Sequence, residues 1–174
     1  MIQGVYLEHV SIHSDAFKEF SQRFGDKLSS LYEVNFTELV NGYLGDATEW
    51  EATAFYHGTT HCGCVDQRVY NVDNAKISVQ DWCMNSYCST RGIMINGHLR
   101  AKLAALDGHF FSPVINIARS FAQTRSKLAG RPLNYLSIFI CIARRVLSSS
   151  NGAHFYYVQN DCDILPVFLA IVQI

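Results

Sequence analysis

The feature that most constrains the fold is a long apolar segment, Tyr135 to Val146. Its apolar residues would lie on both faces of a strand, which is typical of a strand in the middle of a sheet. Two more strands are predicted, at His154 to Val158 and at Ile164 to Val172, after a turn at Ser148 to Gly152. Of the 174 residues, 49% are apolar and 17% are charged, so we expect one globular domain over residues 1–174.

Two helices are predicted in the N-terminal part of the chain. The first begins at Asp15, because Ser14 can act as its N-cap. The second covers Asn35 to Tyr43 and ends before Gly45, and a strand from Trp50 to His57 follows it. The predicted apolar face of the first helix comprises Phe17, Phe20, Phe24, Leu28 and Leu31.

The later part of the chain combines short strands with helices. A helical piece is predicted at Ala101 to Leu106, a brief strand at His109 to Ser112, and a helix that begins at Pro113. Its buried face would comprise Val114, Ile117, Ala118 and Phe121. Helices come first in this interpretation and strands dominate afterwards, which predicts an α+β domain with a mostly antiparallel sheet.

Residues 58–92 are predicted to form a long irregular insertion that is rich in cysteine. Loops of this length are usually functional or held by additional bonds. The cysteines form two close pairs, and four thiolates can bind zinc tetrahedrally. The four candidate metal ligands are Cys62, Cys64, Cys83 and Cys88, and His57 and His61 are possible additional ligands. The alternative is that all the thiols are reduced and free, with Cys141 and Cys162 buried in strands.

Charge and hydropathy exclude several classes of protein. A formal net charge of −1 argues against a general polyanion-binding surface. The N-terminus lacks the pattern of a signal peptide, and no apolar run is long enough to span a bilayer. We therefore expect a cytoplasmic or nuclear protein with reduced cysteines and no membrane partner.

A short motif, FYHGTT at Phe55 to Thr60, combines groups that are suited to binding a ligand. His57 places an imidazole at the end of a predicted strand, and Gly58 allows another molecule to approach the backbone closely. Thr59 and Thr60 can hydrogen-bond within the following loop. The motif alone is also compatible with an ordinary turn.

Several segments in order resemble the catalytic domain of the poly(ADP-ribose) polymerase superfamily, the diphtheria-toxin-like ADP-ribosyltransferases. After an N-terminal helix these segments are LYEVNFTELVNGY, FYHGTT, GHFFS, INIARSFA and ILPVFLAIVQI. The resemblance covers nearly the whole chain, and the cysteine-rich insertion after FYHGTT is most similar to that of fungal members. It implies a split antiparallel sheet and the use of NAD⁺ as co-substrate.

The resemblance also implies roles for individual residues. His57 would hold the ribose next to nicotinamide, and the backbone of Gly58 would pair with the nicotinamide amide. Phe110 and Phe121 would stack on the nicotinamide ring, with Ala118 at the position between them that often carries a hydroxyl. The expected cofactor-binding set is completed by the neighbouring residues Thr59 and Phe111.

The chain departs from the family pattern at one catalytic position. Family members carry a glutamate near the start of the penultimate strand, where its carboxylate stabilises the oxocarbenium character of the sugar. This chain has no glutamate after Glu51, and the matching position falls at His154 or Phe155. We expect His57, Phe110 and His154 to form the catalytic set, with no elongation to poly(ADP-ribose).

Three functions are compatible with these observations. The first is NAD⁺-dependent mono-ADP-ribosyl transfer to an unknown acceptor, a protein or a nucleic acid. The second is a catalytically inactive domain with the same fold that binds a protein or nucleic acid. The third is a metal-stabilised interaction domain unrelated to NAD⁺.

Overall fold

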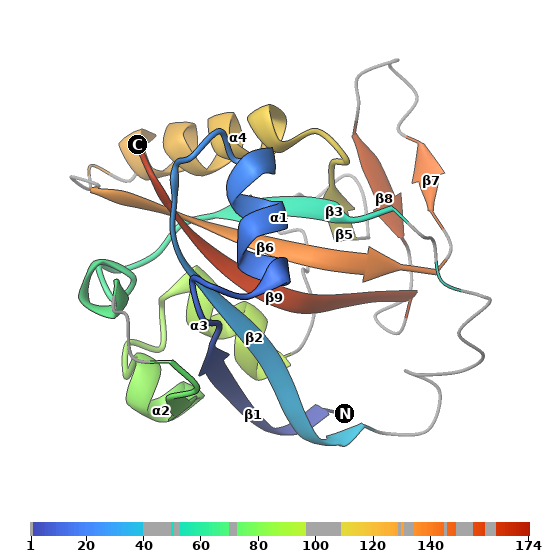
Figure 1. Cartoon of the computed structure of the whole chain (residues 1–174). Coiled ribbons are helices and arrows are strands. Elements are labelled where there is room, and N and C mark those ends of the chain that lie inside the picture. The colour runs from blue at the N-terminus through green and yellow to red at the C-terminus, as the bar shows by residue number, and fades with distance from the viewer. Residues whose placement is uncertain are drawn as a thin grey trace.

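Two antiparallel sheets organise the chain (Figure 1). In this computed structural model the described residues are 2–39, 50, 53–69, 73–96, 109–128, 130, 134–144, 146–148, 155–158 and 163–174. The larger sheet has the strand order β3-β6-β9-β2-β1-β4, and the smaller has the order β5-β8-β7. The strands are β1 (Ile2–His9), β2 (Leu28–Leu39), β3 (Phe55–Thr59), β4 (Lys76–Ser78), β5 (His109–Phe111), β6 (Tyr135–Ala143), β7 (Leu147–Ser148), β8 (Tyr156–Val158) and β9 (Ile164–Gln173).

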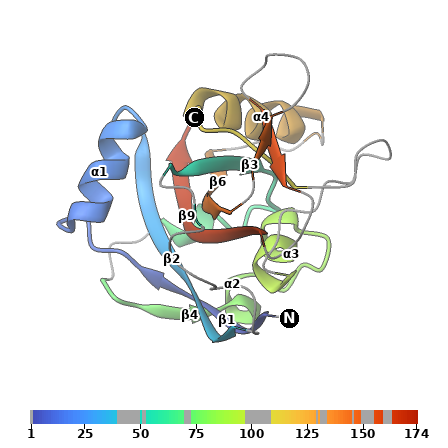
Figure 2. The same ribbon diagram turned by 90° about the vertical axis from the view of Figure 1, so that its right-hand side faces the viewer.

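Helices cover both faces of the larger sheet (Figure 2). They are α1 (Asp15–Arg23), α2 (Val79–Trp82), α3 (Ser89–Asn96) and α4 (Ile115–Leu128), with a 3-10 helix, η2 (Asp66–Arg68). On one face α1 and α4 form a core with β6 that includes Phe24, Ala122 and Ile138. On the other face α2 and α3 pack on the sheet through Trp82 and Met94. The predicted α+β domain with a mostly antiparallel sheet is therefore confirmed.

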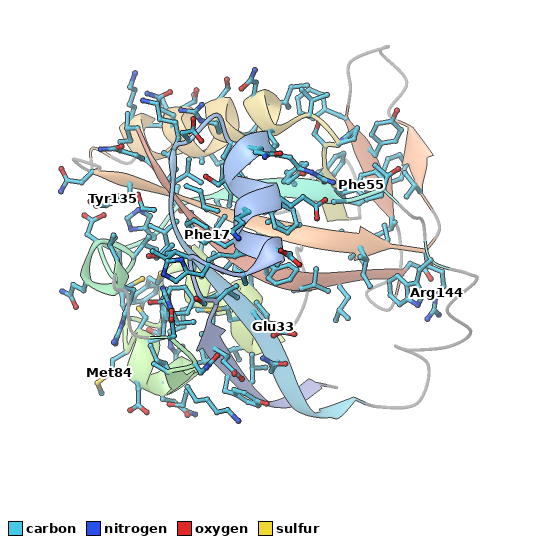
Figure 3. The ribbon with its side chains drawn as sticks, viewed as in Figure 1. Phe17, Glu33, Phe55, Met84, Tyr135 and Arg144 are labelled. Atoms are coloured by element: carbon cyan, nitrogen blue, oxygen red, sulfur yellow. The ribbon has the colours of Figure 1, made fainter. Side chains whose placement is uncertain are left out.

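The central position predicted for the strand at Tyr135 is also confirmed. β6 pairs with β3 on one side and with β9 on the other. All its residues from Leu136 to Cys141 are buried. The strand ends at Ala143, before the predicted Val146. The residue that follows the strand, Arg144, is labelled in Figure 3. Its guanidinium lies 4.6 Å from the ring centroid of Trp50.

The first helix begins where its cap predicts but ends earlier than expected. The Ser14 hydroxyl accepts the N–H of Phe17 at 3.1 Å, and α1 starts at the next residue after the cap. The chain then leaves the helix through Gly25 and Asp26, whose φ values of +59° and +61° are in the left-handed region that glycine adopts most readily and in which aspartate is enriched among the other residues. The extension of the helical face to Leu28 and Leu31 was wrong, because both residues belong to β2.

The second predicted helix, Asn35 to Tyr43, was also wrong over its described part. Residues 35–39 continue β2, which pairs with β1 on one side and β9 on the other. Immediately before this segment, exposed Glu33 lies between buried Tyr32 and Val34, which is the alternation expected of a strand. Residues 40–43 and Gly45 lie outside the described residues. Because β1 precedes α1, the expectation that helices come first was wrong as well.

Other predicted elements are present with shifted boundaries. β3 begins at Phe55 instead of Trp50, and α4 begins at Ile115 instead of Pro113. The Ser112 hydroxyl accepts the N–H of Val114 at 3.0 Å and so terminates the preceding strand before the helix begins. The brief strand at residue 109 and the last strand are confirmed, and β8 begins at residue 156 instead of 154. The helix predicted at 101–106 and residues 149–152 of the turn predicted at Ser148 to Gly152 lie outside the described residues. Ser148 belongs to β7 and not to a turn.

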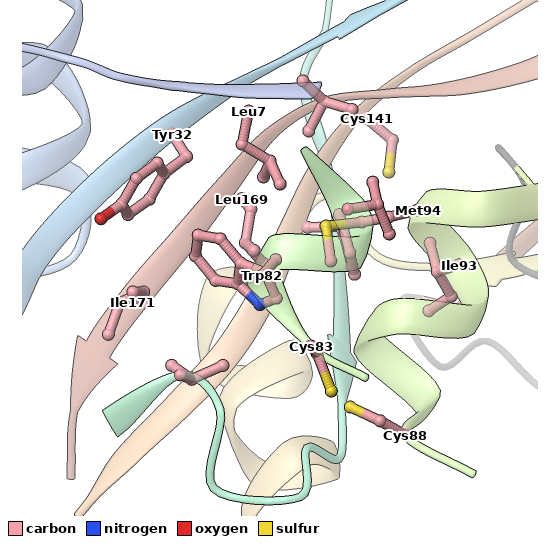
Figure 4. Close-up of a cluster of buried hydrophobic side chains, with 14 of the residues drawn as sticks. Leu7, Tyr32, Trp82, Cys83, Cys88, Ile93, Met94, Cys141, Leu169 and Ile171 are labelled. Atoms are coloured by element: carbon pink, nitrogen blue, oxygen red, sulfur yellow. The ribbon is translucent and has the colours of Figure 1, made fainter. Parts of the chain in front are cut away.

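The region 58–92 is not the irregular insertion that was predicted. It includes the end of β3, then η2, β4 and α2, and the first turn of α3. This region forms regular elements because it packs against the sheet. Trp82 and Met94 are buried in the same core as Leu7 and Leu169 (Figure 4), and Val79 is buried there too. Among the described residues, no helix is long and apolar enough to cross a membrane.

Candidate functional site

β3 and α4 meet at Gly58. A Cβ atom at this position would lie 1.9 Å from the carbonyl oxygen of Ala118 and 3.0 Å from the backbone nitrogen of Ala122. Both contacts are to helix backbone, which cannot move aside as a flexible side chain can. The close approach of strand and helix therefore requires glycine at 58 and is favoured by the small residues at 118 and 122.

The backbone N–H and C=O of Gly58 point away from β6, toward the edge of the larger sheet that β3 forms. Tyr56 donates its N–H to the Ser112 carbonyl at 2.7 Å and accepts the Ser112 N–H at 2.9 Å, both on the side of β3 away from β6. Groups of alternate residues in a strand point to the same side, so the N–H and C=O of Gly58 also point to that edge. A donor and an acceptor presented together in this way are complementary to a carboxamide.

His57 is held by a hydrogen bond that its ring donates to a backbone carbonyl of the neighbouring strand β5. Its Nδ1 lies 2.6 Å from the carbonyl oxygen of Phe110. A carbonyl oxygen only accepts hydrogen bonds, so Nδ1 carries the hydrogen and donates it. In the neutral ring Nε2 is then an acceptor, which suits it to a hydroxyl group.

The two predicted stacking rings lie in aromatic pairs with residues of one segment. Phe110 stacks on Tyr157 with a centroid distance of 5.7 Å and an interplanar angle of 29°. Phe121, which is 41% exposed, contacts Phe155 edge-on at 5.9 Å, and the guanidinium of Arg125 lies 5.4 Å from its centroid. The structure thus places aromatic rings on both β5 and α4, the two elements next to Gly58.

The remaining predicted site residues are distributed differently. Phe111 is buried and packs on Phe55 at 4.8 Å, and the side chain of Thr59 is also buried. Neither side chain is presented to solvent, so both belong to the interior of the domain. His154 lies outside the described residues.

Sequence reasoning did not identify Tyr157 and Phe155 as partners of the predicted stacking rings. The only signal for them was the run of aromatic residues in the segment 154–158, which indicated a strand but not what it faces. Only the pairing of β8 with β5 places this segment beside Phe110. Position 155 is of interest because it is one of the two that match the family glutamate, and here it carries an aromatic ring.

The structure brings the four predicted cysteines together at a second place. Their sulfur atoms all lie within 4.8 Å of one another, so the cluster could hold a metal ion. The Sγ–Sγ distance is 3.4 Å for Cys62 and Cys83, and 3.8 Å for Cys64 and Cys88. Figure 4 shows the sulfur atoms of Cys83 and Cys88 facing each other beside Trp82. We call these four residues the cysteine centre.

Local structure explains how distant cysteines meet. Cys62 and Cys64 follow β3 and are separated by Gly63, whose φ of +100° makes the turn between them. Cys83 is the C-cap of α2, and Cys88 immediately precedes α3. An open hollow of about 350 Å³ adjoins the centre and is lined by three of the four cysteines, with Arg68 and Asp81 among the other residues.

The possible histidine ligands do not belong to the cysteine centre. His61 is buried, its Nδ1 accepts the N–H of Gly63 at 3.0 Å, and its Nε2 lies 2.8 Å from the Tyr135 carbonyl oxygen. With one nitrogen accepting and the other donating, His61 has no nitrogen left to bind a metal. His57 uses Nδ1 to bond Phe110.

Hydrogen bonds and burial change the acidity of the cysteine centre. A hydrogen bond from Cys64 lowers the pKa of Cys88 to about 4, and the backbone N–H of Arg91 contributes in the same direction. The same bond to Cys88, together with burial, raises the pKa of Cys64. Burial raises the pKa of Cys83 to about 11. Cys88 is therefore more acidic than Cys64 and Cys83, whose protons a bound cation would displace.

Aromatic and cationic side chains pack next to the cysteine centre, and these contacts were not predicted. The Arg68 guanidinium lies 5.6 Å from the Trp82 ring centroid and bonds the Trp82 carbonyl oxygen at 3.4 Å. Tyr32 donates its hydroxyl hydrogen to the Arg68 carbonyl oxygen at 2.6 Å. The high aromatic content indicated stacking in general but not these partners.

Comparison with known proteins gives no identification. No protein-family model matches the chain. No curated protein matches it either. Functional conclusions therefore depend on the residues themselves.

Proposed function

We propose that this chain is an NAD⁺-binding domain of the ADP-ribosyltransferase type and that it transfers single ADP-ribose units. The observation that carries the proposal is the arrangement at β3, where the contact of Gly58 with α4 adjoins the His57–Phe110 hydrogen bond. The division into a six-stranded and a three-stranded antiparallel sheet is compatible with the split sheet of that family. The FYHGTT, GHFFS and INIARSFA segments contribute the residues concerned.

In this proposal each group at β3 binds one part of the nicotinamide riboside. The N–H and C=O of Gly58 pair with the carboxamide, which has the complementary acceptor and donor. Nε2 of His57 accepts a hydrogen bond from a hydroxyl of the adjacent ribose. Phe110 and Phe121 supply aromatic surface for the nicotinamide ring, and offset or edge contacts between rings contribute about 0.5–1.5 kcal/mol each.

The chemistry is cleavage of the bond between nicotinamide and ribose with transfer of ADP-ribose to an acceptor. Positive charge develops on the ribose in the transition state, and a carboxylate normally stabilises it. With no glutamate after Glu51, the acceptor's own nucleophile or carboxylate has to assist. Loss of one such stabilising group costs about 2.7–4 kcal/mol by analogy with an oxyanion-hole donor, so turnover is slow and chain elongation is not expected.

A second candidate is the same domain acting as a binding module without turnover. One observation favours it. At one of the two positions that match the family glutamate, Phe155 presents a ring to Phe121 instead of a carboxylate. A site of this kind would retain affinity for nicotinamide while lacking the charge that drives bond cleavage.

For the cysteine centre, zinc is the metal that we propose. Zinc bound by four thiolates is tetrahedral with Zn–S bonds of about 2.3 Å, which places the sulfur atoms about 3.8 Å apart. The Sγ–Sγ distances of 3.4 Å for Cys62 and Cys83 and 3.8 Å for Cys64 and Cys88 are close to that spacing, and all four sulfur atoms lie within 4.8 Å of one another. Four soft thiolate ligands also favour zinc over magnesium or calcium, which are bound through oxygen ligands.

Ligand-induced thermal stabilisation tests the proposed nicotinamide site. A ligand at about 100 times its Kd adds about 2.7 kcal/mol of stability, which is about 5–10 °C in Tm for a chain of this size. We expect such a shift with NAD⁺ and with a benzamide as nicotinamide mimic. His57→Ala should lose the NAD⁺ shift, whereas His13→Ala, on an exposed turn, should keep it.

A second pair of variants addresses the ring contact and guards against misfolding of the first. Phe121→Ala changes a 41% exposed side chain of α4, and Leu128→Ala changes an 83% exposed one on the same helix. Only the first should weaken benzamide binding. Absence of any shift in the wild type at millimolar ligand would refute the NAD⁺ proposal. Binding without nicotinamide release over hours would establish the non-catalytic alternative.

A further inference from the structure

The cysteine centre is built onto the end of the strand that carries His57 and Gly58. β3 ends at Thr59, and Cys62 and Cys64 are the first two ligands after it. Cys88, on the other side of the centre, immediately precedes α3. A metal ion bound by all four cysteines would therefore connect the end of β3 directly to the start of α3.

Hydrogen bonds already join these two points in parallel with the cysteines. The Thr90 hydroxyl donates to the Thr60 carbonyl oxygen at 2.9 Å, and the Thr90 N–H lies 3.2 Å from the same oxygen. The Thr60 hydroxyl donates to the Ser89 hydroxyl at 3.0 Å. The first turn of α3 is thus attached to the residue that follows β3.

The same threonine extends the connection to the central sheet. The Thr90 and Ser137 hydroxyl oxygens are 2.9 Å apart, and both residues are fully buried. Because Thr90 uses its one hydroxyl hydrogen on Thr60, Ser137 donates in this pair. Ser137 is the β6 residue that pairs with Thr59, so the network reaches the residue directly across the sheet from the last residue of β3.

Without a metal ion, the cysteines would contribute little to holding this junction. Thiol groups are weak hydrogen-bond donors and weak acceptors. Metal–thiolate bonds, in contrast, contribute folding free energy outright in small structural zinc sites. The geometry of the junction therefore depends on whether the centre is occupied.

We propose that zinc at Cys62, Cys64, Cys83 and Cys88 fixes the end of β3, so that zinc occupancy controls binding at the nicotinamide site. The second half of this statement rests on the proposed function. The first half concerns only the metal and the strand. Zinc here is a structural ion with four protein ligands and takes no part in the chemistry of ribosyl transfer.

Amide hydrogen exchange on the full chain tests the inference without using activity. Metal analysis of purified protein should give one zinc per chain. After removal of zinc by a chelator, exchange in residues 55–61 should rise at least tenfold. Exchange in residues 164–172 of β9 should stay unchanged, and added zinc should restore protection at 55–61.

Variants separate the metal from the surrounding loop. Cys83→Ser and Cys88→Ser should each lose zinc and reproduce the exchange pattern of the chelated protein. The control is Met84→Ala, which lies between these two ligands and is 90% exposed at the edge of the molecule (Figure 3). It should keep both zinc and protection.

A second pair of variants tests the hydrogen-bonded path itself. Thr90→Val removes the hydroxyl that joins Thr60 to Ser137 and should raise exchange at 55–61 while zinc stays bound. Thr124→Val, on the exposed side of α4, should change neither.

Each alternative result has a definite meaning. Wild-type protein without bound metal would overturn the inference, and so would bound zinc whose removal leaves exchange at 55–61 unchanged. An equal rise at 55–61 and 164–172 would also overturn it, because zinc would then hold the whole domain. If zinc controls exchange but benzamide never binds, the coupling to β3 stands and the NAD⁺ proposal fails.

Discussion

Replacing Gly58 by alanine is the most direct test of the contact between β3 and α4. The new Cβ would lie 1.9 Å from the Ala118 carbonyl oxygen, whereas an ordinary carbon–oxygen contact is about 3.3 Å or longer. The helix would have to move away from the strand by about 1.4 Å. Overpacking in a core costs about 1–3 kcal/mol, and we expect the upper end because both neighbouring atoms belong to backbone.

The loss of stability is measurable by thermal unfolding. A loss of about 3 kcal/mol lowers the Tm of a domain of this size by about 6–12 °C. Displacement of α4 also moves Phe121 away from β3, so benzamide binding should be lost in the fraction of protein that remains folded.

The matched control is Gly92→Ala, in α3. No atom lies within 4 Å of a Cβ added at Gly92, and its backbone is helical. Alanine there should be neutral or stabilise the protein by about 0.5–1 kcal/mol. If Gly58→Ala instead melts within about 2 °C of the wild type, the strand–helix contact described here is wrong.

Two further predictions concern the cysteines. Gly63→Ala forces a residue with a side chain into a backbone φ of +100°, so zinc affinity should fall at least tenfold. Competition with a chromogenic chelator measures this affinity. An unchanged affinity would contradict the described turn. Burial raises the pKa of Cys141, so this thiol stays protonated at neutral and mildly alkaline pH, where a thiolate is needed for alkylation. The peptide that contains Cys141 should remain unlabelled by iodoacetamide in native protein at pH 8 and become labelled after unfolding. Rapid labelling of the native protein would show that β6 is more open than described.

The parts of the fold that sequence predicted well are those where one local signal dominates. Ser14 marks the start of α1 because its hydroxyl caps the helix within three residues. The segment from Tyr135 is apolar on both faces because β6 is covered on both sides of the sheet. Neither conclusion needs information about distant residues.

The errors arose where distant partners decide the structure. Residues 35–39 carry apolar groups at helical spacing, yet they continue β2 because this part of the strand pairs with β1. No strand was predicted before residue 10, and this segment becomes β1 by pairing with β2 and β4.

The candidate sites divide in the same way. The clustering of the four cysteines was predicted, since four thiols in two pairs suggest a shared metal site, and their sulfur atoms lie within 4.8 Å of one another. Spacing alone could not show that Cys62 meets Cys83 and Cys64 meets Cys88, because that depends on how α2 and α3 pack on the sheet. For the proposed nicotinamide site, His57 and Gly58 were chosen from sequence, but the contact with Ala118 that explains the glycine was not predicted.

The position of β9 has a consequence for how this domain folds. β9 lies between β6 and β2 and so joins the group β3-β6 to the group β2-β1-β4. It pairs Leu28 with Val172, so this contact spans almost the entire described chain. Such non-local pairing slows folding, typically to milliseconds or seconds. Until β9 is inserted, β2 and β6 each have an unpaired edge that can recruit strands from other molecules. Self-association during synthesis or refolding is therefore governed by the rate at which one strand enters the sheet.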